Sequence, residues 1–317
     1  MLLHDTPISE MLPGDDIEGF YLLNDPAVRT SKNGKPYLAG KLADRTGSIE
    51  LRAWDYPGPL GSGDAGSVVK VRGQVGEFGG EPQFNVRLIR AAAEGDVYDR
   101  AALVPTAPID PDAAMAEIRR LIAGFRDDDY RALAAGMLDK NEALLRSFPA
   151  AKSMHHSFVS GLLMHTLGML RLADRIAGLY PEVIDRDLLL TGTLLHDFAK
   201  AKEFDLSPLG LVADYSVQGQ LLGHLYMGAR DVAAMAEALG IPAEKSLLVQ
   251  HLIVSHHGTR EFGAITLPAT AEAELLSYLD LIDSRMEIYR ETLADVEPGQ
   301  FSGPVFALDR RRLYRHF

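Results

Sequence analysis

The stretch Leu194-Leu195-His196-Asp197-Phe198-Ala199-Lys200 places a histidine and an aspartate side by side in a mostly apolar segment. A buried carboxylate is costly unless it is paired or bound to a metal. Asp197 among leucines therefore needs a partner, and a cation shared with neighbouring imidazoles would supply one. Histidines crowd the same region, since eight of the ten in the chain lie between His155 and His257. This part of the sequence is therefore predicted to hold a metal site.

The candidate ligands form an ordered series, and each lies in a helical, largely apolar context. The series is His165, His196-Asp197, His224, His256-His257 and Asp280. Imidazole is the commonest metal ligand, and a set of this size exceeds the needs of one tetrahedral site, which favours two metal ions. A single histidine on an apolar helix is more often a hydrogen-bonded core residue. Five such positions in one series are hard to explain as independent accidents.

Composition limits the chemistry of this site. The chain has 317 residues, 47% hydrophobic and 24% charged, which is typical of a soluble globular protein with two or more domains. It has no cysteine, which excludes disulfides, thiolate zinc sites and a cysteine nucleophile. Any metal must be held by nitrogen and oxygen. Adjacent helical side chains point about 100° apart, so either His196 and Asp197 converge on one metal or Asp197 bridges two.

The charge balance bears on the class of partner. A formal net charge of -12 argues against a protein that coats nucleic acid, because that role needs a basic surface. It does not exclude a nuclease, whose metal-bound carboxylates count as negative here. The N-terminus shows no basic segment followed by a long apolar run, and no stretch is long enough to span a membrane. We therefore expect no signal peptide, no membrane association and a cytoplasmic location.

The first part of the chain, residues 1–95, has the pattern of a small β-domain. Short apolar runs alternate with turn residues, as in the Gly79-Gly80 turn. The runs are 20–23, 37–42, 49–54, 68–75 and 84–89. Five short strands in this length predict a small antiparallel β-barrel, with a β-sandwich fragment as the alternative. Residues 96–111, with three prolines, are predicted to be a linker.

From residue 112 the pattern becomes helical. Asp112 is a predicted N-cap, with Pro111 just outside the helix. Further helices are expected at 128–148, 155–178, 186–200, 216–239, 244–257 and 270–293. Residues 112–298 are thus predicted to form an all-α bundle, and residues 299–317 a short basic tail. The fold class expected for the chain is multidomain, with a β-barrel followed by a helical bundle.

The ligand series resembles the H…HD…H…H…D signature of the HD-domain metal phosphohydrolases. The phrases that carry it are LLMHT, LLHDFAKAKEF, GQLLGH, SHHGTREFGA and YLDLIDSRM. Together with the barrel, the chain is similar to the YhaM-type 3′-to-5′ exoribonucleases, which carry an OB-fold before the HD domain. The N-terminal phrase VRTSKNGKPYLAGKLADRTGSIELRAWD looks like the OB strands of that family. Met164 stands where the family often has an acidic residue, which puts a carboxylate partner for His165 in question.

The resemblance implies how the ligands divide. One metal is held by His165, His196, Asp197 and Asp280, and a second by His224, His256 and His257, with Asp197 bridging the two. The implied mechanism is phosphodiester hydrolysis by a two-metal-activated water. Two imidazole-rich sites suit manganese, iron, cobalt or nickel better than magnesium, and manganese is the first expectation.

Other residues near the series are given roles as hypotheses. Lys200 lies one helical turn after Asp197 and can contact a substrate phosphate, although a solvated lysine is an equal alternative. His156 is a candidate proton donor or substrate contact. His251 is left out of the ligand set, and Asp283 either caps a helix or orients a ligand. The predicted catalytic residues are therefore Asp197, Lys200 and His156.

The barrel offers candidate contacts for a single strand. Lys32, Lys35 and Tyr37 follow the first strand, where OB-folds commonly bind nucleic acid. Trp54 and Phe84 could stack on bases, although aromatic residues in a small barrel are more often core.

The function that this combination favours is a 3′-to-5′ exonuclease acting on single-stranded RNA, and also on single-stranded DNA as a further substrate. One alternative is a phosphohydrolase of small nucleotides, such as a cyclic nucleotide, a dNTP or an alarmone. Another is a nucleic-acid-binding protein with an inactive metal site. The resemblance also implies a homo-oligomer.

Overall fold

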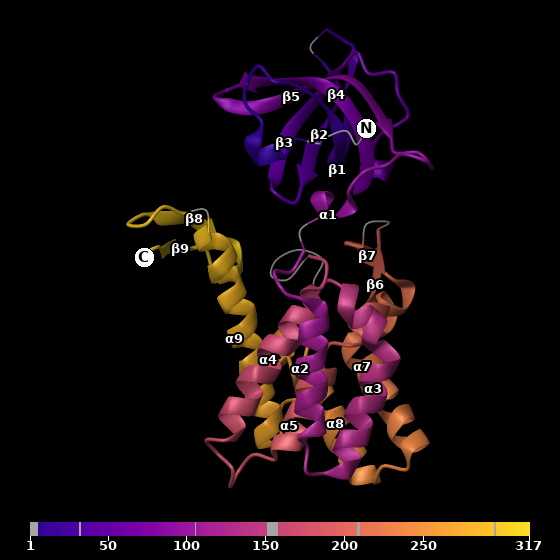
Figure 1. Cartoon of the computed structure of the whole chain (residues 1–317), viewed down its shortest axis with the longest axis vertical. Helices are drawn as coiled ribbons and strands as arrows, with labels where there is room; N and C mark the ends of the chain where they lie inside the picture. Colours follow the sequence, from indigo (N-terminus) through magenta and orange to yellow (C-terminus); the bar gives the residue numbers. More distant parts are fainter. Residues whose placement is uncertain (1–5, 32, 105, 151–157, 208–209, 295) are drawn as a thin grey trace. The chain divides into compact units, whose positions relative to one another are not determined.

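The computed structural model describes residues 6–31, 33–104, 106–150, 158–207, 210–294 and 296–317. The chain divides into two compact units, Met1–Thr106 with Ser207–Leu209, and Ala107–Leu206 with Gly210–Phe317. The first is a β-barrel and the second a bundle of helices (Figure 1).

The N-terminal unit is a closed five-stranded barrel. Its strands are β1 (Asp16–Thr30), β2 (Pro36–Asp44), β3 (Gly47–Trp54), β4 (Ser67–Phe78) and β5 (Glu81–Ala91), followed by the short helix α1 (Arg100–Leu103). The order of neighbours around the barrel is β1-β2-β3-β5-β4. A closed Greek-key barrel of five strands is an OB-fold, so the predicted barrel is confirmed and the sandwich alternative is wrong. One pair differs from the antiparallel prediction, because β3 and β5 close the barrel in parallel.

The barrel core follows from the alternation of side chains along each strand. Tyr21 and Leu23 of β1, Leu38 of β2 and Leu51 of β3 are all fully buried in one apolar cluster. The residues between them point outward, because successive side chains of a strand face opposite sides. The packing of this cluster therefore fixes which residues of each strand lie on the outer surface of the barrel.

Truncating this core should destabilise the barrel. Leu51→Ala removes a side chain that is 0% exposed and is expected to lower the free energy of unfolding of the barrel by roughly 2–5 kcal/mol. Trp54 is the chain's one tryptophan, so its fluorescence in a urea titration reports on the barrel. Leu88→Ala, on the exposed side of β5, should cost about 0.5 kcal/mol or less. Equal effects of the two substitutions would contradict this core.

The second unit is built from eight helices in the part of it that the structure describes. They are α2 (Pro111–Ala123), α3 (Asp128–Ser147), α4 (Gly161–Ala177), α5 (Arg186–Leu195), α6 (Lys200–Glu203), α7 (Val217–Leu239), α8 (Ala243–Ser255) and α9 (Ala271–Ala294). The unit also contains two β-hairpins that the sequence did not predict. One pairs β6 (Phe204–Leu206) with β7 (Val212–Tyr215), and the other pairs β8 (Phe301–Val305) with β9 (Arg311–Tyr314). None of the described helices has the length and apolar character of a membrane-spanning segment.

Helix α5 is the centre of the bundle. Every residue of this helix except Arg186 is buried, and it packs against α3, α4, α8 and α9. The carboxylate of Asp185 caps its start by accepting from the backbone N–H groups of Asp187 and Leu188. His196 and Asp197 directly follow this buried helix, so they too are buried in the bundle.

Candidate metal centre

The structure brings all seven predicted ligands together from five parts of the chain. His165 lies on α4, His196 and Asp197 follow α5, His224 lies on α7, His256 and His257 follow α8, and Asp280 lies on α9. Their ligand atoms form three groups, within each of which all atoms lie within 4.8 Å of one another. The groups are His165/His196/Asp280, His224/His256/His257 and His196/Asp197/His256. The first two groups share no residue, so the arrangement has room for two cations.

Asp197 lies between these two groups. Its Oδ2 atom is 3.3 Å from Nε2 of His196 and 3.7 Å from Nε2 of His165. Its Oδ1 atom is 3.7 Å from Nε2 of both His224 and His256. Each oxygen of the carboxylate therefore faces one group, which is the geometry of a bridging ligand.

The other ring nitrogen of four histidines is held by a hydrogen bond. The Nδ1 partners are Asp283 Oδ2 for His165 at 2.8 Å, Thr193 O for His196 at 2.9 Å, Glu203 Oε2 for His224 at 2.9 Å and Ile253 O for His256 at 2.8 Å. A backbone carbonyl only accepts, so Nδ1 of His196 and of His256 carries the proton. When these rings are neutral, their Nε2 atoms are unprotonated, which is the form that binds a metal.

These Nε2 atoms converge on one another. Nε2 of His165 and Nε2 of His196 are 3.3 Å apart, and two nitrogens at that distance need a proton or a cation between them. Among the described residues, His224 Nε2 and Asp197 Oδ1 are buried and have no hydrogen-bond partner. Unpaired buried polar atoms are costly. A metal ion in each group would satisfy these atoms, so the residues fit the two cations predicted.

The Asp197 carboxylate favours positive charge next to it: burial lowers the pKa of His196, but Asp197 outweighs it and raises that pKa. Burial, together with the nearby His196, holds the pKa of His256 well below its usual range, so its ring is neutral. Burial alone would raise the pKa of Asp197, but Lys200 and His196 outweigh it and hold that pKa well below its usual range. The ammonium of Lys200 lies 2.7 Å from Asp197 Oδ2. Burial lowers the pKa of Lys200, but Asp197 and Asp280 outweigh this and raise it, so Lys200 stays charged beside the centre.

Two glycines allow the acidic side chains to approach His165 and His224. A Cβ at Gly168 on α4 would lie 2.6 Å from Asp283 Oδ1, so a larger residue there would force that carboxylate to shift from its position behind His165. Gly223 has φ 69° and ψ 158°, which interrupts α7 one residue before His224. That backbone is one that residues with a Cβ rarely adopt, and the kink aims His224 at Glu203 and Asp197.

Two acidic side chains lie behind the ligand histidines. Asp283, for which the sequence left open helix capping or ligand orientation, is hydrogen-bonded to Nδ1 of His165. Glu203, a buried acid on α6, was not predicted, because nothing in its short polar segment distinguishes it from a surface residue. His251 lies outside the ligand groups, and its Nε2 accepts from the backbone N–H of Ala269 at 2.9 Å. His156 lies outside the described residues.

The barrel brings three of the predicted nucleic-acid contacts together. Tyr37 and Trp54 are paired across β2 and β3, with ring centroids 4.9 Å apart, and Trp54 is 57% exposed. Lys35 lies next to them in sequence and forms an exposed ion pair with Asp55 at 2.7 Å. The prediction for Phe84 is wrong, because its ring is 0% exposed in the barrel core and cannot stack on a base. Lys32 lies outside the described residues.

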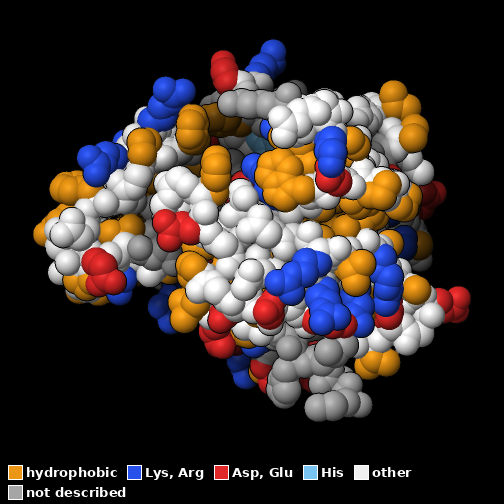
Figure 2. Space-filling model, turned by 90° about the horizontal axis from the view of Figure 1, so that it is seen from above, with side chains coloured by type: hydrophobic (Ala, Val, Ile, Leu, Met, Phe, Trp, Pro, Cys, Tyr) orange, Lys and Arg blue, Asp and Glu red, His pale blue; other side chains and the backbone are white. Residues whose placement is uncertain are grey.

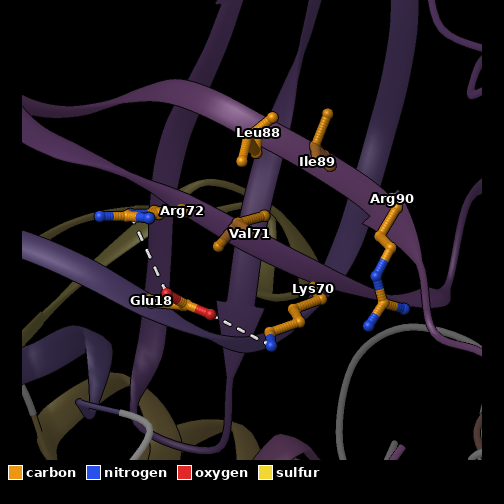
Figure 3. A pocket seen from close by; sticks show the side chains of 7 residues that line it. All are labelled: Glu18, Lys70, Val71, Arg72, Leu88, Ile89 and Arg90. Carbon is orange, nitrogen blue, oxygen red and sulfur yellow. Dashed lines mark ion pairs between the residues drawn. The ribbon is translucent and has the colours of Figure 1, made fainter.

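A hollow elsewhere on the barrel is less suited to a ligand. It is lined by side chains of β1, β4 and β5 (Figure 3). Glu18 lies 3.1 Å from Lys70 and 3.9 Å from Arg72, and Arg90 pairs with Asp96. The carboxylates of Glu18 and Asp96 thus offset two of the three positive charges there. Lys and Arg side chains on the face in Figure 2 also lie among Asp and Glu, with hydrophobic side chains between them.

The barrel and the buried His/Asp centre define an OB-fold joined to a metal-dependent hydrolase of the HD-domain class. The HD domain family matches residues 162–285, which contain all seven ligands. A protein from Bacillus velezensis named 3′-5′ exoribonuclease YhaM is 37% identical over 303 residues, covering 95% of each chain. The chain therefore belongs to the YhaM-type family of HD-domain proteins, and the resemblance seen in the sequence is confirmed.

Solved structures were also compared with the chain. The second OB-fold domain of replication protein A from Methanococcus maripaludis covers 29% of this chain and 98% of its own, with 20% identity and a TM-score of 0.22. The OB domain of Ta0387 from Thermoplasma acidophilum covers 31% and 90%, with 15% identity and a TM-score of 0.22. The OB-fold assignment rests on the strand order of the barrel itself.

The Asp283 contact gives a prediction about metal affinity. In Gly168→Ala the new methyl group must displace Asp283, which frees the His165 ring and should weaken metal binding about 10- to 100-fold. Asp283→Ala should have a similar effect. Titration against a competing chelator measures the affinity. The control Gly136→Ala places its methyl against only the flexible side chains of Met235 and Leu239 and should bind metal like the parent protein. Unchanged affinity in both test variants would show that Asp283 has no part in metal binding.

Proposed function

We propose that the protein is a metal-dependent phosphodiesterase that removes nucleotides from the 3′ end of single-stranded RNA, with single-stranded DNA as a further substrate. The observation that carries the proposal is the Asp197 carboxylate facing two groups of histidine ligands. Two-metal sites of this kind are typical of phosphoester hydrolysis. The direction and the RNA substrate are inferred from the name of the Bacillus velezensis relative.

The proposed ligand division follows the two groups. His165, His196 and Asp280 would hold one cation, His224, His256 and His257 the other, and Asp197 would contact both. The nitrogen-rich donor set favours manganese first, with iron, cobalt or nickel as alternatives. When bound, the two cations would neutralise charge on the phosphoryl group and activate a water molecule for attack.

Lys200 is the chain's own positive charge at this centre. Its side chain is 20% exposed and its ammonium lies 2.7 Å from Asp197, so it can turn from that carboxylate to a phosphoryl oxygen of the substrate. A lysine acts there as a point charge that offsets the charge growing in the transition state. The role of His156 as a proton donor stays a prediction.

The outer face of β2 and β3 is the proposed surface for the strand. Tyr37 pairs with Arg29 of β1 on one side and with Trp54 of β3 on the other, so one row carries a cation and two aromatic rings. Base stacking on aromatic side chains and contacts between cations and phosphates are how OB-folds bind single strands. This arrangement favours a nucleic acid over a small nucleotide as substrate. A homo-oligomer and a cytoplasmic location stay predictions.

Asp197→Asn tests the proposed activity. The amide keeps the size of the side chain but removes the bridging charge, so the variant should bind fewer metal ions and lose at least about 1000-fold in kcat/KM. Manganese-loaded protein is incubated with 5′-labelled single-stranded RNA, and products are resolved by length. Progressive shortening from the 3′ end is expected with the parent protein and not with the variant. If the metal-loaded parent protein left the RNA intact, the exonuclease proposal would be contradicted and a small nucleotide would become the expected substrate.

Trp54→Ala tests the barrel surface. Removing the ring should raise KM for a long single strand about 5- to 100-fold, because stacking contributes about 1–3 kcal/mol per base, and kcat should change little. Steady-state kinetics on a long strand and on a dinucleotide separate the two domains, since the dinucleotide should be hydrolysed normally. Leu88→Ala, on the exposed side of β5, serves as the control. A Trp54→Ala variant with unaltered KM on the long strand would place RNA binding elsewhere.

A further inference from the structure

A cavity of about 270 Å³ opens directly beside the metal centre. One side is formed by three of the ligands, His256, His257 and Asp280, and the rest by the loop after α8 and by α9. All of its lining belongs to the helical unit. Anything bound in this cavity would therefore adjoin a group held at the metals.

The cavity carries large apolar side chains that the fold leaves in solvent. Phe262 is 73% exposed, Tyr278 is 53% exposed and Leu281 is 44% exposed, and all three line the same cavity. Exposed aromatic rings grouped beside a site are more informative than scattered ones, because a fold gains nothing by leaving them in water.

Away from the proposed metal ligands, the described part of the cavity offers no positive side chain to a phosphate. Its described lining contains no lysine or arginine, and Asp280, its one charged residue, is a proposed metal ligand. The polar groups are mostly hydroxyls. Ser277 Oγ donates to the carbonyl of Glu274, and Ser284 Oγ donates to that of Leu281, so both keep lone pairs that can accept. Aromatic rings with a few hydroxyls suit a neutral ring joined to a sugar.

We propose that this cavity holds the nucleoside at the 3′ end of the RNA, with its base stacked on Phe262 and Tyr278 and its ribose near Ser277 and Ser284. This inference rests on the proposed function and names a substrate position in the same site. The scissile phosphate then lies at the metals and Lys200, while the terminal base fills the neighbouring cavity. Stacking gives affinity without regard to base identity, and the described lining has no amide or guanidinium side chain to read a base edge.

The test compares two RNAs that differ only at the last nucleotide. One ends in a normal nucleotide and the other in the same ribose without its base. The parent protein, loaded with manganese, should remove the normal nucleotide at least about 10-fold faster, as measured by kcat/KM for the first cleavage. Phe262→Ala should lose that advantage on the normal RNA and cleave the abasic RNA as the parent does. Phe262→Trp, which keeps an aromatic face, should retain it.

The controls separate this position from a general defect. Phe306→Ala removes another exposed phenylalanine of the same unit, outside the cavity, and should leave both rates unchanged. Metal content should be the same in all variants. Equal cleavage of the two RNAs by the parent, or an equal loss on both in Phe262→Ala, would overturn the assignment of the cavity while leaving the exonuclease proposal intact. Failure of the metal-loaded parent to cleave either RNA would overturn both.

Discussion

The convergence of buried imidazoles on one buried carboxylate is the constraint on which the helical domain depends. Nε2 atoms of four histidines lie around the two oxygens of Asp197, with His165 and His196 only 3.3 Å apart at their ring nitrogens. Backbone carbonyls accept the Nδ1 protons of His196 and His256, so the Nε2 atoms of these two rings are the ones available to a metal. Without cations such a cluster would cost free energy, and with them it becomes a tight site.

The rest of the bundle can be understood as the support that this cluster requires. The nearly complete burial of α5 fixes the place of His196 and Asp197. The bare backbone of Gly168 admits Asp283 behind His165, and the interruption at Gly223 turns His224 toward Glu203. Partners behind the ligands set ring orientation and basicity, and through them the affinity for metal. The exposed rings of Phe262 and Tyr278 lie outside this support and line the cavity proposed for the terminal nucleoside.

The ligand set could be predicted because histidine and aspartate are unusual in apolar helical segments and can be recognised from the sequence alone. The support behind it was predicted only in part: Asp283 was named with two possible roles, and Glu203 was missed because its contact with His224 joins residues 21 positions apart. The start of α2 was misplaced for a local reason: Asp110 caps the helix and Pro111 is its first residue, since proline fits the first turn. Phe84 shows the limit of reading aromatic residues, because its strand position alone decides that it faces the core.

The central claim is that two cations lie on either side of Asp197. A crystal of the manganese-loaded protein, measured with anomalous X-ray scattering, tests it most directly. The account predicts two peaks about 3.5–4 Å apart, one beside His165, His196 and Asp280 and the other beside His224, His256 and His257, with an Asp197 oxygen on each. A single peak, or two peaks of which Asp197 contacts only one, would contradict it.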